Sequence, residues 1–417
     1  MTYETSFLTN GIKVVTENMD GVRSAALGLW VRTGSRDETP EQAGISHFME
    51  HMLFKGTPTR DAMEISSAFD ALGAEVNAFT SRECTCFYSR MIDNHFPECF
   101  EILADMLVNP LFSQDTVVPE REVVLEEIAR SEDTPDDHVF DVFMDALYPT
   151  HPLGRPVLGT QSVVSAFTGD DLRSYHEQHY TSGNVFVVAC GNIDHAKVVA
   201  QAEQLLSGLK VAPFKQRGGF EDVPAISLAC STKESEQAHI VIGKRIFGAD
   251  DSKRYAFQMM NSALGGGMSS RLFTEIREKR GLVYSVFSTA QLCEGSGQFM
   301  AYAGTRPDNA AEVVSLFNSE FAAMAQDGIG LDEFERVREM VCGGYVLGME
   351  SPKSHMFRLG KMVASGRELL TIDQTLQAYR DVTVEQVNQI AAEVLDGEMT
   401  VAVASQFNEE ELKEMFA

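Results

Sequence analysis

Long apolar segments are missing from this chain. No run approaches the ~20 consecutive apolar residues that a helix needs to cross a bilayer, although 44% of the 417 residues are hydrophobic. The N-terminal segment has no basic region followed by an apolar core, and no Arg-rich amphipathic leader. We therefore expect a soluble, cytoplasmic protein with no membrane span. The missing leader fits a bacterial chain, although a mature organellar chain would look the same.

Positive charge is also scarce. The chain has 34 Lys and Arg residues against 61 Asp and Glu residues, which gives a formal net charge of −27 at pH 7. A nucleic-acid backbone would be repelled by this charge, so we expect no nucleic-acid partner. The same field would attract cationic peptides, but acidity that only keeps the protein soluble explains the composition equally well.

Cysteine is too sparse and too scattered for a disulfide framework. An odd number of cysteines, mostly within apolar segments, indicates reduced and buried thiols in a cytosol-like compartment. Cys84 and Cys86 would face the same side of a strand, and we interpret them as packing residues because no second cysteine pair completes a zinc site. The seven positions are 84, 86, 99, 190, 230, 293 and 342.

The length suits two domains of about 200 residues each. Residues 211–219, VAPFKQRGG, are typical of a linker. The order of expected strands and helices on its N-terminal side recurs on its C-terminal side, and both halves close with a helix and a buried strand. The sequence therefore predicts an α+β protein of two tandem homologous domains, 1–210 and 220–417, each with a mostly antiparallel sheet backed by helices.

The segment His47-Phe-Met-Glu-His51 carries the strongest chemical signal. A capping box at residues 39–42 predicts the start of a helix that ends at Gly56. Residues four apart share one face of a helix, so His47 and His51 can bind one metal ion. Glu50 lies on the same side, within reach of a metal-bound water. The order H-x-x-E-H supplies two zinc ligands and a general base, although a chance cluster on an amphipathic helix would look the same.

A catalytic zinc site needs a third protein ligand. The segment 119–133, PEREVVLEEIARSED, contains the best candidate. Glu120 and Glu127 lie two helical turns apart and point the same way, whereas Glu122 and Glu126 project elsewhere. From the pattern alone, Glu127 is as consistent with a solvent-facing acid as with a metal ligand.

Three motifs together are specific to a known family. HFMEHMLFKGT, NAFTSRECTCFY and EREVVLEEI resemble, in order, those of the pitrilysin/insulinase superfamily of inverted-motif zinc metallopeptidases. The closest likeness is to the branch of the mitochondrial processing peptidase β-subunit and its bacterial homologues, and it covers nearly the whole chain. The resemblance implies one Zn²⁺ per chain, held by His47, His51 and Glu127. It also implies that Glu120 orients a histidine and that Glu50 is the general base.

The second half of the chain also matches the family. Arg277 and Tyr284 in IREKRGLVYSV resemble an arginine and a tyrosine that the family brings to its active site. The resemblance implies that Tyr284 donates a hydrogen bond to the tetrahedral oxyanion and that Arg277 holds the substrate. Without the resemblance, a surface cation and a core aromatic would be the ordinary interpretations.

The resemblance further implies a set of substrate-binding residues. Asn77, Ala78 and Phe79 would lie on a strand to which an extended peptide adds as another strand. Phe54 would line an apolar pocket after the cleaved bond. Asp137 and Asp141, one helical turn apart, would bind an arginine before that bond. From the pattern alone, residues 77–79 would form an ordinary edge strand, and Asp137 and Asp141 would be interpreted as solvated helix charges.

These observations predict a zinc-dependent endopeptidase that hydrolyses extended, basic peptides or presequence-like segments. Two domains of this family form half of a clam shell, so we expect a homodimer or a heterodimer with a non-zinc homologue. The alternative is a non-catalytic or partner-dependent structural subunit with the same fold. The intact motif argues against it, as does the short turn Leu264-Gly-Gly-Gly-Met268 where the family's non-zinc partner has a long glycine-rich loop.

Overall fold

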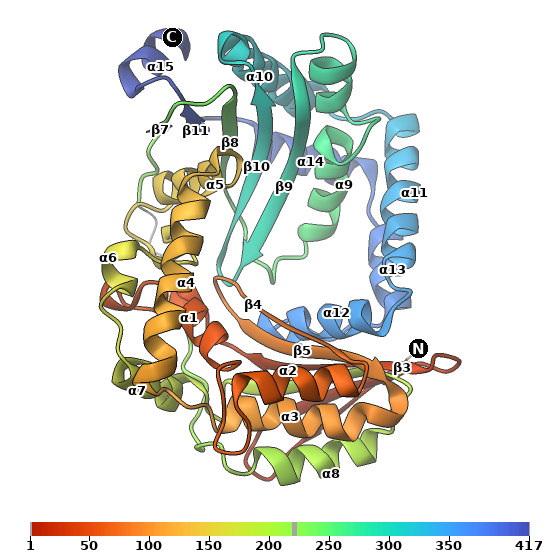
Figure 1. The fold of residues 1–417 in the computed structure, drawn as a ribbon. Helices are drawn as coiled ribbons and strands as arrows, with labels where there is room; N and C mark the ends of the chain where they lie inside the picture. The colour runs from red at the N-terminus through yellow and green to blue at the C-terminus, as the bar shows by residue number, and fades with distance from the viewer. Residues whose placement is uncertain (1, 219–222, 417) are drawn as a thin grey trace. The chain divides into compact units, whose positions relative to one another are not determined.

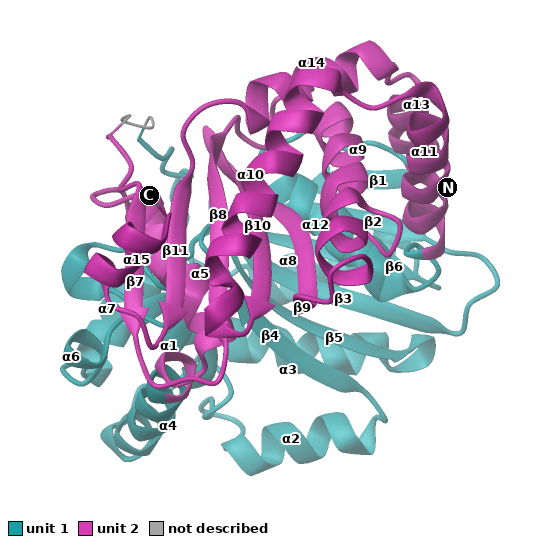
Figure 2. Ribbon diagram, turned by 90° about the horizontal axis from the view of Figure 1, so that it is seen from above, with its two compact units in different colours: residues 1–129, 155–218, 348–371 teal, residues 130–154, 219–347, 372–417 magenta. Residues whose placement is uncertain are grey.

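The computed structural model describes residues 2–218 and 223–416, which form two compact units. Residues 1, 219–222 and 417, which include the end of the expected linker and the start of the expected second domain, lie outside the described part. Figure 2 colours the units: unit 1 comprises residues 1–129, 155–218 and 348–371, and unit 2 comprises residues 130–154, 219–347 and 372–417.

The units differ from the continuous ranges 1–210 and 220–417. Segment 130–154 belongs to unit 2 although it precedes the linker, and segment 348–371 belongs to unit 1 although it follows the linker. Each segment contributes a helix that packs on the sheet of the unit to which it belongs, as described below.

Unit 1 is built on a six-stranded mixed sheet in the order β1-β2-β6-β3-β5-β4. Strands β2 and β6 are parallel, and the other neighbouring pairs are antiparallel. This order leaves β4 at an edge, paired with β5 so that Asn77 lies opposite Tyr88. The strands are β1 Tyr3–Phe7, β2 Lys13–Asn18, β3 Ser24–Val31, β4 Glu75–Thr80, β5 Thr85–Ile92 and β6 Val185–Gly191.

Alternate residues of β3 face two apolar layers. Leu27 and Leu29 join the core formed with helices α3 (Phe96–Val108) and α8 (His195–Leu206). Ala26 and Trp30 face the opposite way, into a cluster with helix α12 (Pro352–Ala364). Figure 1 shows α12 on one face of this sheet and α2, α3 and α8 on the other. Unit 1 also contains α1 Ile45–Met52, α2 Ala62–Ala71, α6 Gln161–Val164, α7 Gly169–His179 and most of α4 Gln114–Glu132, whose residues 130–132 belong to unit 2.

Unit 2 has a five-stranded sheet in the order β7-β11-β8-β10-β9. One face packs on helices α9, α10 and α14, and the other packs on α5 through Val139, Phe143 and Leu147. Its strands are β7 Leu228–Thr232, β8 Ala238–Ile246, β9 Val283–Cys293, β10 Ser296–Thr305 and β11 Thr400–Ser405. Its helices are α5 Pro135–Leu147, α9 Arg254–Gly265, α10 Ala310–Asp327, α11 Leu331–Leu347, α13 Ile372–Arg380, α14 Val384–Leu395 and α15 Glu409–Phe416, with a π-helix at Phe273–Glu278.

These two helix-backed sheets confirm the predicted α+β class. The seven cysteines are all free thiols, and six of them, including Cys84 and Cys86, are buried. Within residues 2–218 and 223–416, no helix combines the length and the apolar character that crossing a bilayer would require.

Candidate metal centre

Helix α1, which carries the histidine pair, begins later than predicted. Thr39 and Gln42 do form a capping box, but the box belongs to a separate 3₁₀ turn, Pro40–Gln42. The α-helix starts only at Ile45, after Gly44 in a left-handed conformation with φ of +96°. An L side chain rarely adopts this φ, so glycine suits the position. The expected continuous helix from residue 39 was therefore wrong, although the histidines do lie on a helix.

The structure brings His47, His51 and Glu127 together. Glu127 Oε2 lies 3.5 Å from Nε2 of His47 and 3.4 Å from Nε2 of His51. One ligand atom from each of the three residues lies within 4.8 Å of the others. Helix α1 supplies the imidazoles and α4 supplies the carboxylate. Two imidazoles and one carboxylate match a zinc site that keeps a coordination position open.

A carboxylate orients the ring of His51. His51 Nδ1 donates to Glu120 Oε1 at 2.8 Å, and Lys55 Nζ lies 2.6 Å from Glu120 Oε2. Burial raises the pKa of Glu120, but its hydrogen bonds to His51 and Lys55 outweigh burial and lower it. Burial lowers the pKa of His51, but the bond to Glu120 and the charge of Glu127 reverse that effect and raise it. With its Nδ1 proton held by Glu120, His51 turns Nε2 toward Glu127.

The ring of His47 is supported differently. Its Nδ1 is buried and has no hydrogen-bond partner among the residues that the structure describes. Burial, followed by the nearby charge of His51, lowers the pKa of His47 to about 4. His47 is therefore neutral at pH 7, and neutral imidazole is the form that binds a metal.

Glu50 lies beside this cluster and is fixed by strand β4. Thr80 Oγ1, on the last residue of β4, donates to Glu50 Oε2 at 2.6 Å. Burial raises the pKa of Glu50, and the hydrogen bond from Thr80 only partly offsets that effect. The raised pKa suits a carboxylate that must accept a proton and release it again. Thr80 was not identified from the sequence, because its role depends on a contact between two elements.

Strand β4 also carries three of the predicted substrate-binding residues. Asn77 and Ala78 lie in the middle of this edge strand, and Asn77 Oδ1 accepts from the Ala78 amide at 2.7 Å. The ring of Phe79 packs edge-on against Trp30 at a centroid distance of 5.6 Å. Phe54, just beyond α1, is half-buried, and its ring lies 6.3 Å from that of Phe87.

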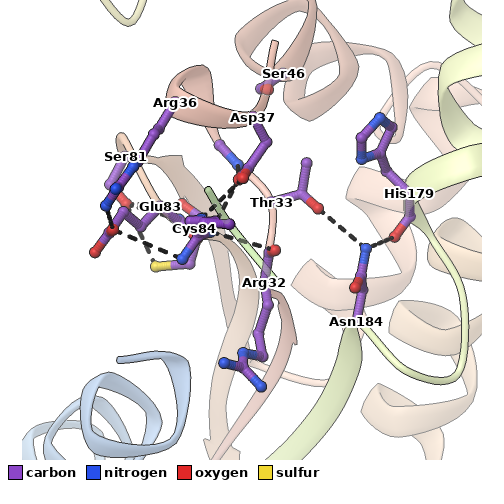
Figure 3. A network of polar contacts seen from close by, with 12 residues as sticks. Arg32, Thr33, Arg36, Asp37, Ser46, Ser81, Glu83, Cys84, His179 and Asn184 are labelled. Atoms are coloured by element: carbon purple, nitrogen blue, oxygen red, sulfur yellow. Dashed lines mark hydrogen bonds and ion pairs between the residues drawn. The ribbon is translucent and has the colours of Figure 1, made fainter. Parts of the chain in front are cut away.

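The turn between β4 and β5 is tied to the segment that precedes α1. The Ser35 amide donates to the Ser81 carbonyl at 3.2 Å, and the Arg36 amide donates to the Arg82 carbonyl at 2.8 Å. The Arg36 guanidinium lies 2.5 Å from Glu83. Figure 3 shows this network of polar contacts. It anchors the turn just after Thr80, which helps to fix the bond from Thr80 to Glu50. No sequence pattern indicates this network.

The other predicted site residues belong to unit 2. The Arg277 guanidinium lies 5.4 Å from the centroid of the Tyr284 ring, and Tyr284 is 82% exposed. Tyr284 is therefore no core residue, contrary to the ordinary interpretation of an aromatic in a strand. Asp137 and Asp141 lie one turn apart on α5. The roles of these four residues at the metal centre stay predictions.

Comparisons with known proteins find relatives across nearly the whole chain. Residues 13–161 match the family described as insulinase (peptidase family M16), and residues 166–341 match the peptidase M16 inactive domain. An uncharacterized zinc protease of Mycobacterium leprae is 42% identical over 402 residues, covering 95% of this chain and 90% of the relative. An uncharacterized zinc protease of Bacillus subtilis is 38% identical over 396 residues, covering 95% of this chain and 96% of the relative.

Two solved structures share the fold. A peptidase M16 inactive domain from Pseudomonas fluorescens superposes with a TM-score of 0.92 at 22% identity, covering 98% of this chain and 99% of that one. A protease from Helicobacter pylori superposes with a TM-score of 0.88 at 21% identity, covering 97% and 99%. The family matches and the identity to relatives across nearly the whole chain show that this protein belongs to the insulinase (M16) peptidase family.

Proposed function

We propose that this chain is a zinc-dependent endopeptidase with Glu50 as its general base. The observation that carries the proposal is the convergence of His47, His51 and Glu127, with their ligand atoms within 4.8 Å of one another. Relatives of similar length from Mycobacterium leprae and Bacillus subtilis are named zinc proteases, which supports zinc as the metal.

The chemistry follows from the side chains that surround the metal position. Zinc held by His47, His51 and Glu127 would acidify a water molecule and polarise the scissile carbonyl. Glu50 would take a proton from a water molecule as the water oxygen adds to the scissile carbonyl, and would pass that proton to the amine that leaves. Thr80 holds Oε2 of Glu50, so proton transfer falls to Oε1. Tyr284 would donate to the oxyanion, and Arg277 would hold the substrate.

The substrate we propose is an extended peptide. Strand β4 is an edge of the six-stranded sheet, and an edge strand can accept a peptide as a further strand. Asn77 and Ala78 would supply the backbone contacts, with Phe79 beside them, and Phe54 would contact an apolar side chain after the cleaved bond. We also propose that this chain belongs to the processing-peptidase branch of the family.

The proposed preference is for basic peptides. Asp137 and Asp141 lie one helical turn apart on α5, and two carboxylates so spaced can bind a guanidinium. We expect the double variant Asp137→Asn/Asp141→Asn to hydrolyse arginine-containing peptides less well relative to matched neutral peptides. An unchanged ratio of kcat/KM values would assign the preference elsewhere. We also propose that the chain pairs, as a homodimer or with a non-zinc homologue.

The general-base assignment is tested with the Glu50→Gln variant. We expect this variant to retain about one zinc per chain by metal analysis and to lose hydrolysis of a basic peptide, because Glu50 is not a ligand. Zinc loss in the variant would show that Glu50 is assigned wrongly. The wild-type chain should cleave the peptide, and this hydrolysis should stop when a chelator is added. A wild-type chain that binds zinc but never cleaves would favour the structural-subunit alternative, which the match to an inactive domain keeps open.

A further inference from the structure

Glu38 is a buried carboxylate at the N-terminus of the helix that carries the metal-binding histidines. Only 4% of its surface is exposed. Its Oε2 accepts from the Gly44 amide at 2.9 Å, and its Oε1 accepts from the Ser46 amide at 2.8 Å. Glu38 therefore satisfies two amides at the start of α1 that no carbonyl of the helix can reach. No sequence pattern indicates this role for Glu38.

The two histidines of α1 depend on different supports. His51 is oriented through its side chain by Glu120 and Lys55. His47 has no such partner on Nδ1 within the described residues. The direction of the His47 ring therefore follows from the backbone of the first helical turn. That backbone is held at the immediately preceding residue, Ser46, by Glu38.

The buried charge of Glu38 is costly, which argues for a role beyond filling space. Burial raises the pKa of Glu38 to about 7, despite the hydrogen bonds from Ser46 and Gly44 and the charge of Arg155. A glutamine would have the same shape without the charge. However, its NH₂ group would face a backbone amide that can only donate, so one of the two hydrogen bonds would be lost.

We infer that Glu38 is a positioning residue for metal binding. Its carboxylate fixes the first turn of α1, and through that turn it holds Nε2 of His47 at the distance from His51 and Glu127 that a single metal ion requires. This inference rests on the proposed zinc site. A merely structural cap would stabilise the fold without changing zinc affinity beyond what the lost stability explains.

The test is the zinc affinity of the Glu38→Gln variant, measured with zinc alone by competition with a chromogenic chelator at pH 8. We expect affinity about tenfold below that of the wild-type chain, the lower end of the range for residues that orient metal ligands. The matched control is Glu17→Gln. Glu17 is a carboxylate of the same unit with 1% exposure, bound by His355 at 3.0 Å and by Arg358 at 2.9 Å. The control should lower Tm but keep zinc affinity within about twofold of wild type.

A second measurement separates positioning from stability. The visible spectrum of Co²⁺ bound in place of zinc reports ligand geometry, so it should change in Glu38→Gln and stay unchanged in Glu17→Gln. Equal zinc affinity in wild type and Glu38→Gln, or an equal loss in the control, would overturn the inference. A wild-type chain that binds no zinc would instead overturn the proposed function.

If Glu38→Gln does not fold, Glu38→Asp replaces it. Its shorter side chain reaches one amide only, so unchanged affinity there would also overturn the inference.

Discussion

Replacing Gly360 with alanine tests the packing of α12 on the sheet of unit 1. A Cβ atom at residue 360 would lie 2.1 Å from Cζ2 and 2.2 Å from Cε2 of Trp30. Carbon atoms in contact normally lie about 3.5–4.0 Å apart, so the methyl group and the indole cannot both keep their places. Trp30 is fully buried, and its ring stacks on Phe186 at 5.8 Å. The indole therefore has no free space to move into, and α12 must shift away from the sheet.

Two opposing effects set the size of the change. Alanine stabilises a helix interior by up to about 1 kcal/mol relative to glycine. Forcing an extra methyl group into a well-packed core costs about 1–3 kcal/mol, and an overlap with a rigid ring falls at the upper end. We therefore expect Gly360→Ala to lower the free energy of unfolding by about 2 kcal/mol. For a unit of roughly 200 residues, this corresponds to a Tm lower by about 4–8 °C.

The matched control is Gly344→Ala in helix α11. Gly344 is exposed, and among the described residues a Cβ atom there would meet no atom within 4 Å outside its own helix backbone. Only the helix propensity acts at this site, so Gly344→Ala should raise the stability by up to about 1 kcal/mol. Thermal unfolding followed by circular dichroism would show shifts of opposite sign for the two variants. If Gly360→Ala stabilised the protein as much as Gly344→Ala, α12 would not pack on Trp30 as described.

Two further predictions concern the carboxylates near the metal centre. Glu120→Gln should bind zinc about 10–100-fold more weakly in the same chelator competition, because His51 loses its charged partner; unchanged affinity would contradict the role given to Glu120. The raised pKa of Glu38, about 7 against a usual 4.5, means that the folded, zinc-free chain binds more protons than the unfolded chain between these pH values. The contribution of Glu38 to stability is therefore full below pH 4.5 and decreases by about 3 kcal/mol as pH rises through 7. The Tm of wild type minus that of Glu38→Gln should accordingly fall between pH 5 and 7.5, and a constant difference would refute this.

The metal cluster could be predicted because helical spacing determines most of its geometry. His47, Glu50 and His51 lie within two turns of α1, and Glu120 and Glu127 lie two turns apart on α4. Residues three, four or seven positions apart share one face of any helix, independently of the tertiary structure. That α4 faces α1 is a tertiary contact, which the spacing alone could not reveal, and the family resemblance supplied it.

The start of α1 and the composition of the units could not be predicted in the same way. Thr39 and Gln42 obey a local capping rule, yet they enclose only a 3₁₀ turn. The true start depends on the left-handed backbone of Gly44 and on the side chain of Glu38, six residues before it. The place of α12 likewise depends on Gly360 fitting against Trp30. The contact of Glu38 joins residues close in the sequence and that of Gly360 joins residues far apart, but neither leaves a periodic signal.

The acidic residues of this chain show why composition alone is a weak guide to function. From composition alone, the net charge of −27 is explained either by solubility or by attraction of cationic peptides. Three buried carboxylates contribute neither to solubility nor to the attraction of peptides, because each binds a different kind of group inside the protein. Glu38 binds backbone amides, Glu17 binds the cation of Arg358, and Glu120 binds an imidazole. Only Glu120 was identified from the sequence, because its spacing from Glu127 and its family motif are both local. Glu17 pairs with Arg358, 341 positions later in the chain. Glu38 binds amides only six and eight residues after it, but that spacing follows no helical or strand period.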